Sequence, residues 1–405
     1  SPSSPKRRVE KPRVSTPWAR KRKRVFVVFL VFAVVLSPAV VWRLRLANEV
    51  HQLVAEHRER GLPLRVEVLH EGGDLFADSE NGAEDLRTAA RIFQGFSQQQ
   101  KELLPFQPGR KPHAEIEFSD EQWGVITAVV AANREVLERL YAGAEKSYIR
   151  YPQEYLSDDA MAAEPDADTL SAFAVLLCCD AVLAADAKDS ASAWRALRAA
   201  LAVIRSLGSN GLLDTLYRQW ELESGMLYAL QWVLGETPAD AVLLSDFAAY
   251  FTREQRVAQW QRACDVELSD FVTRLSGDRQ RSLFQALLIA VGVGDLNLKV
   301  AFSLYEPMRS GFGLPREKQR AYEAAYFEAQ QELKGHGLLY ATVRRHHEPP
   351  YWDVMRAACD EMVVAEHAFS VENYRITHGV YPESAGLEGA LGERMLSEGV
   401  TLEYE

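Results

Sequence analysis

The 405-residue sequence contains only four cysteines, Cys178, Cys179, Cys264 and Cys359. So few cysteines in so long a chain exclude a small protein held together by a disulfide framework. No CxxC pair and no CxxCH haem attachment site occurs, so thioredoxin-like, zinc-ribbon and cytochrome c chemistry have no support. We expect buried, unreactive thiols. One disulfide between distant helices stays the alternative if the domain lies outside the cytoplasm.

The short motifs of common active sites are also missing. There is no GxSxG, no Walker lysine loop, no HExxH and no paired ExxH motif of a di-iron bundle. The glycines of Gly292-Val293-Gly294 lack the third glycine and the preceding strand of a dinucleotide fingerprint. The sequence therefore predicts no catalytic residue and no cofactor. Enzymatic activity would need a site that only the fold assembles.

Histidines and acids are densest around the paired prolines at 349–350. The candidate metal-ligating residues there are His346, His347, Glu361 and Glu366. Glu366 and the adjacent His367 point about 100° apart on a helix, so they do not converge on one ion. Solvated helix ends and loops explain these residues without a metal. An envelope enzyme with a site around them is the alternative.

Residues 25–42 carry no charged side chain. The residues before this segment are net positive, and the residues after it are net negative. Residues 1–24 hold ten Lys or Arg and one Glu, so the formal net charge of −11 leaves −20 for residues 43–405. A helix of residues 25–42 is about 27 Å long, close to the hydrocarbon thickness of a bilayer. We therefore expect a membrane anchor. Its apolar contacts are expected from Val25, Phe26, Phe29, Leu30, Phe32, Leu36 and Trp42.

The charges beside this segment set its expected direction. Arg20, Lys21, Arg22, Lys23 and Arg24 come directly before it. The positive-inside rule keeps such a cluster in the cytoplasm and places the acidic bulk outside. The alternatives are a signal peptide cleaved near Ser37-Pro38-Ala39 and a buried core helix. We interpret the basic tail as topogenic charge, rather than as a site for lipid headgroups or nucleic acid, and we expect no nucleic-acid partner.

Helical periodicity dominates the acidic part, while alternation typical of strands is scarce. The pattern predicts an all-α protein: an N-terminal transmembrane helix, then a multi-helix antiparallel bundle or an α-solenoid-like domain. The expected parts are a basic tail (1–24), the transmembrane helix (25–42), a juxtamembrane helix and loop (43–80), an extracytoplasmic helical domain (81–379) and a C-terminal extension (380–405). The expected helices of that domain are 83–96, 119–142, 169–188, 190–207, 211–234, one capped by Thr237, 252–277, 283–293, 315–334 and 350–378. A proline-containing loop is expected after 83–96, and Ser119 with Gln122 suits a capping box at the start of 119–142. The helices 169–188 and 190–207 are expected to join at Asp189 as a tight hairpin.

The sequence VENYRITHGVYPES, Val371 to Ser384, is typical of a helix exit. His378 lies in the last turn, Gly379 suits a left-handed cap, and Pro382 after Tyr381 stops the helix from resuming. This stretch resembles the YRxxHGxYPxS segment of a family of uncharacterised, single-pass, membrane-anchored bacterial proteins. It is more loosely similar to type II secretion pseudopilins.

Other segments extend the resemblance to that bacterial family. They are Leu53–Leu64, Glu80–Ala89, Leu201–Leu230 and Ala263–Phe271. The chain departs from the pattern at Ala385, where leucine is usual, and it has no later loop with proline and aspartate. The resemblance implies a bacterial inner-membrane protein with its helical domain in the periplasm. It implies no activity and no catalytic residue.

These features predict a non-catalytic, membrane-anchored scaffold or protein-interaction subunit. Its expected partners are the lipid bilayer and other membrane or envelope proteins, because helical faces provide grooves for partner segments. An accessory component of a secretion or pilus-like machine is an alternative that rests on the Tyr381-Pro382 segment. The sequence leaves the oligomeric state open.

Overall fold

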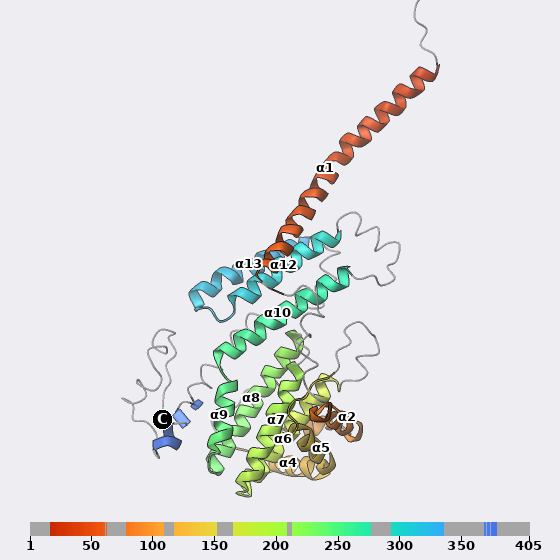
Figure 1. The fold of residues 1–405 in the computed structure, drawn as a ribbon. Coiled ribbons are helices and arrows are strands. Elements are labelled where there is room, and N and C mark those ends of the chain that lie inside the picture. The colour runs from red at the N-terminus through yellow and green to blue at the C-terminus, as the bar shows by residue number, and fades with distance from the viewer. Residues whose placement is uncertain are drawn as a thin grey trace, which may run out of the picture. The chain divides into compact units, whose positions relative to one another are not determined.

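The chain is described by a computed structural model that covers residues 17–60, 62, 78–108, 117–151, 165–208, 213–276, 293–335 and 368–378, the last with gaps at 370 and 373. Within these ranges the regular elements are helices, and the one parallel β-bridge, between Asn81 and Tyr148, is isolated (Figure 1). The prediction of an all-α fold is confirmed.

The described elements have the following order along the chain. They are α1 (Pro17–Glu59), α2 (Ala83–Ile92), α3 (Gln98–Leu103), α4 (Asp120–Ala132), α5 (Arg134–Ala144), α6 (Ala167–Asp186), α7 (Ser190–Leu207), α8 (Leu213–Glu236), α9 (Ala241–Tyr250), α10 (Arg253–Ser276), α12 (Val293–Gly311) and α13 (Arg316–Gly335), with a 3₁₀ turn, η3, at Asp78–Glu80.

The chain divides into two compact units. One comprises Ser1–Glu56 and Asp278–Lys299, and the other comprises His57–Gly277 and Val300–Glu405. In the first unit, Lys299 Nζ and Glu49 Oε2 form an ion pair of 2.7 Å between α12 and α1. The second unit contains the helical core and the hollows described below.

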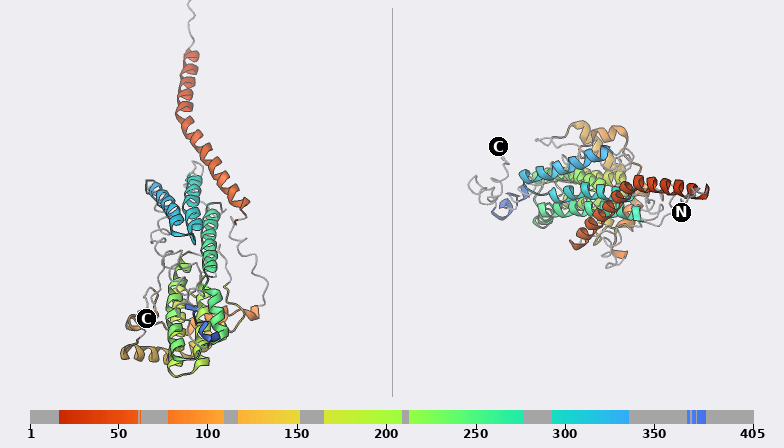
Figure 2. Two further views of the ribbon diagram at one scale, coloured as in Figure 1. Left: turned by 90° about the vertical axis from the view of Figure 1, so that its left-hand side faces the viewer. Right: turned by 90° about the horizontal axis from the view of Figure 1, so that it is seen from above.

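The core of the second unit is formed mainly by α6, α7 and α8. Each of these three helices packs against the other two, and they run side by side in both views (Figures 1 and 2). Small buried residues let α7 approach its neighbours closely. They are Ala193, Ala196, Ala199 and Ala200. The sequence left bundle and solenoid open, and mutual contact among three consecutive helices is common to both architectures.

A tight turn joins α6 to α7, as the sequence predicted at Asp189. Lys188 has φ 61°, and the Lys188 and Asp189 amides donate to the Ala185 and Ala184 carbonyls. Asp189 then caps α7, because its carboxylate accepts a 3.1 Å hydrogen bond from the Ser192 amide. The two helices therefore fold back on each other as an antiparallel hairpin.

Glycine allows α2 and α5 to meet at backbone distance. A Cβ built on Gly82 would lie 2.2 Å from the Gly143 carbonyl oxygen, and one on Gly143 would lie 2.6 Å from Leu86 Cδ1. Side chains at these positions would separate the helices. This contact places α5 where it borders α7.

The helix predicted first in the helical domain was too long. The helix expected over 83–96 ends at Ile92, because Phe93 turns extended, with ψ 125°, and packs its ring 5.3 Å from that of Phe173. The following segment, predicted as a loop, contains α3. Its N-cap Ser97 forms a capping box with Gln100 that the sequence analysis missed.

The helix expected over 119–142 begins as predicted, with Ser119 and Gln122 in a capping box. It divides into α4 and α5 at Asn133. The Asn133 side chain donates a hydrogen bond of 2.8 Å to the Val129 carbonyl oxygen. Hydrogen bonds of this kind compete with the backbone hydrogen bonds that would continue the helix.

The predicted cap at Thr237 was wrong. Thr237 is buried and its hydroxyl donates 2.8 Å to the Val233 carbonyl oxygen at the end of α8. Asp240 caps α9 instead, accepting from the Val242 and Leu243 amides. The start of α10 matches the prediction, because Thr252 Oγ1 accepts 3.3 Å from the Gln255 amide.

Helix α12 was not predicted, because glycine and proline interrupt its periodicity. The helix expected over 283–293 lies outside the described residues except for Val293, where α12 begins. The helix expected over 350–378 is described only from residue 368 onward.

Among the described residues, α6 is a helix long and apolar enough to cross a membrane, and 61% of that stretch is buried inside the domain. Because α6 contacts α4, α7 and α8, this burial is that of a central core helix.

Candidate functional site

Two adjoining hollows lie along α7. They hold about 670 Å³ and 650 Å³ and share Ala144, Arg198 and Leu243 in their walls. Helix α7 lies between the end of α5 on one side and α9 on the other, and we call the combined depression the α7 groove. A volume of this size suits a ligand or a peptide segment.

The exposed strip of α7 supplies much of this groove. Arg195, Arg198 and Arg205 are exposed and Ala202 is half-buried, whereas most of the other α7 side chains are buried in the core. The spacings of three, four and three residues place them on one face of the helix. Because the opposite face of α7 is buried in the core, Arg195, Arg198 and Arg205 are held along its exposed face.

The first hollow has a mixed lining, in which the apolar Ala191, Ala199, Pro238 and Ala239 lie beside the charged Glu145, Arg195, Arg198 and Asp240. Trp194 is 2% exposed and donates from Nε1 to the Pro238 carbonyl oxygen at 3.0 Å. This bond ties the α8–α9 connection to α7.

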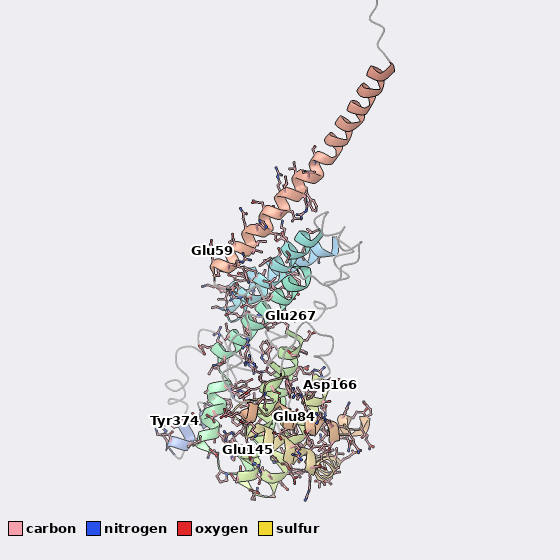
Figure 3. All side chains as sticks on the ribbon, turned by 45° about the vertical axis from the view of Figure 1, so that its right-hand side comes forward. Glu59, Glu84, Glu145, Asp166, Glu267 and Tyr374 are labelled. Carbon is pink, nitrogen blue, oxygen red and sulfur yellow. The ribbon has the colours of Figure 1, made fainter. Side chains whose placement is uncertain are left out.

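An ion pair borders the first hollow. Arg195 reaches Glu145, labelled in Figure 3, at 2.6 Å, and its guanidinium lies 4.4 Å from the centre of the Tyr141 ring. The charge of Arg195 is therefore already balanced at the end of α5.

The second hollow is cationic. Lys146, Arg198 and Arg205 line it, against one acidic residue, Asp246. Lys146 Nζ donates to the neutral Ser79 carbonyl at 3.1 Å, and Arg205 lies 4.2 Å over the Tyr250 ring. Within the described ranges no carboxylate pairs with any of these three cations.

A buried polar network supports the second hollow from behind. The hydroxyl of Tyr250, a residue in the wall of this hollow, donates a hydrogen bond of 2.5 Å to Glu223 Oε1. Gln219 Nε2 donates a hydrogen bond of 2.8 Å to the same oxygen. Arg256, on α10, forms an ion pair with the other Glu223 oxygen, and the two side chains are 6% and 1% exposed. Burial raises the pKa of Tyr250, so its hydroxyl keeps the proton it donates. The network joins α8, α9 and α10.

Gly208 leaves room for this network. A Cβ on Gly208 would lie 2.0 Å from Gln219 Oε1. The glycine at the end of α7 therefore lets the Gln219 amide sit where it contacts both Glu223 and Tyr250.

A second buried pair lies at the α5–α6 contact. The Tyr141 hydroxyl donates to Asp180. Burial raises the pKa of both groups, with the Asp180 charge adding to the effect on Tyr141 and the Tyr141 hydrogen bond opposing it on Asp180. The pair joins α5 to α6 and orients the Tyr141 ring under Arg195.

Three cysteines are described, and all three are unpaired and buried, as expected for inert thiols. Burial raises the pKa of Cys178 to about 12 and that of Cys179 and Cys264 well above the ordinary value. Thiols held protonated in this way are poor nucleophiles and poor metal ligands at neutral pH. Cys359 lies outside the described residues.

The residues predicted for a metal site, His346, His347, Glu361 and Glu366, lie outside the described residues. In the ranges that are described, no three His, Cys, Asp or Glu side chains gather as metal ligands would. Neither hollow of the α7 groove is lined by histidine or cysteine.

The predicted C-terminal turn is described up to His378. The His378 ring stacks on Tyr374, 4.0 Å between ring centres, and its Nδ1 lies 3.0 Å from the Tyr374 carbonyl oxygen. Gly379, Tyr381 and Pro382 lie outside the described residues.

The residues predicted for the anchor and the basic cluster before it fall within α1, which is one helix through both. No protein-family model, no curated protein and no solved structure matches this chain. The resemblance of the C-terminal segment to a membrane-anchored bacterial family stays a prediction.

The arginines of α7 were not predicted as functional residues from the sequence. Their signal is present: Arg195, Arg198 and Arg205 repeat at three and seven residues in a helix that is otherwise rich in alanine and leucine. Such spacing marks one helical face. The spacing alone could not show that residues of α5 and α9 lie on either side of that face.

Proposed function

We propose that the protein is a single-pass membrane scaffold, whose acidic helical domain lies outside the cytoplasm and docks another envelope protein in the α7 groove. The observation that carries the proposal is helix α1. It is continuous over 43 residues and contains the uncharged segment 25–42.

Exposed apolar side chains on α1 support the anchor. Among the described residues seven large hydrophobic side chains are exposed, and four of them lie within five consecutive positions of α1. They are Val40, Val41, Trp42 and Leu44, with exposed fractions of 54%, 47%, 49% and 65%. A contiguous apolar surface of this kind is costly in water and favourable in lipid, and a tryptophan suits the bilayer interface.

Charge supports the direction of insertion. The basic cluster Arg20–Arg24 precedes the apolar segment, and the chain after it carries a net −20. The positive-inside rule then favours a cytoplasmic N-terminus and, for a bacterial protein, a periplasmic domain. The bacterial inner membrane is part of the proposal and rests on the sequence resemblance.

The α7 groove supports a scaffold role. Its walls come from α5, α7 and α9, which the helical core holds in place, so the surface is preformed for a partner segment.

Membrane insertion is tested with charges placed in the anchor. Phe29→Arg with Phe32→Arg should shift the full chain from the alkali-washed membrane fraction to the supernatant, because each charge at a helix centre costs about 2.5–3.5 kcal/mol. Val242→Arg is the matched control, since Val242 is 72% exposed on α9, and should leave the chain in membranes. A wild-type chain released by alkali would refute the anchor.

Partner docking is tested with a photo-crosslinking residue at Ala202, in the wall of the groove. The control places the same residue at Arg139, exposed on α5 and outside both hollows. The proposal expects the same discrete adduct in repeated experiments at 202 and none at 139. Only monomer at both positions would contradict a scaffold role.

A further inference from the structure

We propose that the cationic end of the α7 groove binds an acidic segment of the partner protein, with Arg198 as the principal contact for its carboxylates. This inference rests on the proposed function, because it names the chemistry of the segment that the groove would dock.

The charge of the second hollow is opposite to that of the chain around it. Residues 43–405 carry −20, yet this hollow is lined by Lys146, Arg198 and Arg205 with Asp246 alone against them. A concave surface of one sign concentrates the field that a ligand feels. The surrounding negative charge would repel a diffuse polyanion, so a short acidic segment fits better than nucleic acid.

Arg198 has no partner to displace. Among the residues that the structure describes, it forms neither an ion pair nor a hydrogen bond, and it lines both hollows. Its neighbour Arg195 is already paired with Glu145. A guanidinium offers five N–H donors in a fixed fork that matches a carboxylate, so Arg198 can bind one without first breaking a contact.

Arg205 is fixed by a neutral partner. It lies over the ring of Tyr250, whose hydroxyl is tied to the buried Glu223. A cation held by a ring face keeps its full positive charge while losing side-chain freedom. The network behind the hollow thus prepares Arg205 to meet a second acidic group.

The shape of the groove favours a peptide over a small anion. From Ser190 to Ser206, the ends of α7 that line the hollows, the helix rises about 24 Å. The first hollow offers an apolar strip, formed by Ala191, Trp194 and Pro238 among others. A segment with an apolar stretch and acidic residues at one end would fill both, whereas an isolated carboxylate or phosphate would occupy the cationic end alone.

The test uses the full chain in nanodiscs of zwitterionic lipid and measures fluorescence anisotropy. The probe is a labelled peptide of about 16 residues, matched to the groove length, with leucine and alanine in one half and glutamate in the other. A peptide with glutamine for glutamate is its neutral counterpart. We expect the glutamate peptide to bind more tightly, and to weaken as ionic strength rises from about 0.05 to 0.5 M.

Arg198→Gln should weaken binding of the glutamate peptide about tenfold and leave the glutamine peptide unchanged. Arg139→Gln is the matched control, because Arg139 is also exposed and has no described ion pair. Both variants retain the basic tail of residues 1–24, so any binding of the peptide there is common to them. Since both arginines are exposed, circular dichroism should show unchanged folding.

Equal binding of the two peptides, or equal affinity of Arg198→Gln and wild type, would overturn the proposal. So would inorganic phosphate binding to the same arginine as tightly as the peptide. If an uncharged or basic peptide binds and Ala202→Trp blocks it, the groove docks a partner of other chemistry; the proposed function then stands and this inference fails. If no peptide binds and the crosslink at 202 is also missing, both fail.

Discussion

Removing Arg256 should destabilise the domain more than any surface substitution. Its guanidinium pairs with Glu223, and both side chains are almost fully buried. Tyr250 and Gln219 both donate hydrogen bonds to the other carboxylate oxygen. Both groups are neutral, so they do not replace the positive charge that is lost. Arg256→Met leaves a buried carboxylate without its cation, which costs about 3–5 kcal/mol. The Arg256 guanidinium lies 5.3 Å from the ring centre of Trp220 and 5.6 Å from that of Phe251. A methionine side chain can pack against these two rings, so little free energy is lost to a cavity.

The measurement is urea-induced unfolding of the full chain in detergent, followed by far-ultraviolet circular dichroism. The control is a double-mutant cycle with Glu223→Gln, which removes the charge but still accepts hydrogen bonds from Tyr250 and Gln219. We expect the double variant to be more stable than Arg256→Met alone, with a coupling of about 2 kcal/mol. A loss below about 1 kcal/mol for Arg256→Met, or strict additivity, would refute the account of this network.

Three further predictions concern glycine, the α6–α7 turn and pH. Gly208→Ala should lower the free energy of unfolding by about 1–3 kcal/mol, because the added Cβ would displace the buried Gln219 amide. Gly124 is the control: it is exposed within α4 with open space around it, so Gly124→Ala should raise the free energy of unfolding by about 0.5–1 kcal/mol. Equal effects of the two substitutions in urea unfolding would contradict the packing described at Gly208. Lys188 has φ 61° and forms an exposed ion pair with Glu236. Lys188→Gly should raise the free energy of unfolding by about 1 kcal/mol, because glycine adopts this backbone conformation without strain. A decrease would show that the ion pair outweighs the backbone strain. Burial lowers the pKa of His57 below its ordinary value of 6.5. The unfolded chain therefore binds a proton at a higher pH than the folded chain does, and stability should fall as the pH drops below 6.5. In His57→Gln, the midpoint of urea unfolding should depend less on pH in this range.

Local signals predicted the helical hairpin and several helix starts. Asp189 between two alanine-rich segments, and Ser119 with Gln122, satisfy backbone donors within three residues of themselves. Such bonds depend on neighbours in the sequence alone, so they could be read before the fold was known. The all-α class followed in the same way from periodicity.

Contacts between distant segments could not be predicted. The sequence around Thr237 offers both threonine and Asp240 as caps, and burial of Thr237 against α8 decided between them. Phe93 leaves its helix because Phe173, eighty residues later, provides a surface for its ring. These choices depend on tertiary packing, which overrides local propensity.

The groove was unpredictable for the same reason. Arg198 and Arg205 are visible as a spacing on α7, but Lys146 and Asp246 come from other helices or connections. Their meeting depends on how α5 and α9 pack on the helical core. The buried Glu223 is still harder to foresee, because it lies within an amphipathic helix where acids are normally solvated.

The central claim, an anchor with its domain outside the cytoplasm, is tested most directly by labelling intact bacterial cells with a membrane-impermeant maleimide. Ser245→Cys places a thiol on exposed α9, and Ser4→Cys places one before the basic cluster. The parent chain gives the background, and its three described cysteines are buried. We predict that the thiol at 245 is labelled in intact cells and the thiol at 4 only after lysis. The reverse order, or a chain labelled at 245 only after lysis and recovered in the supernatant, would contradict the account.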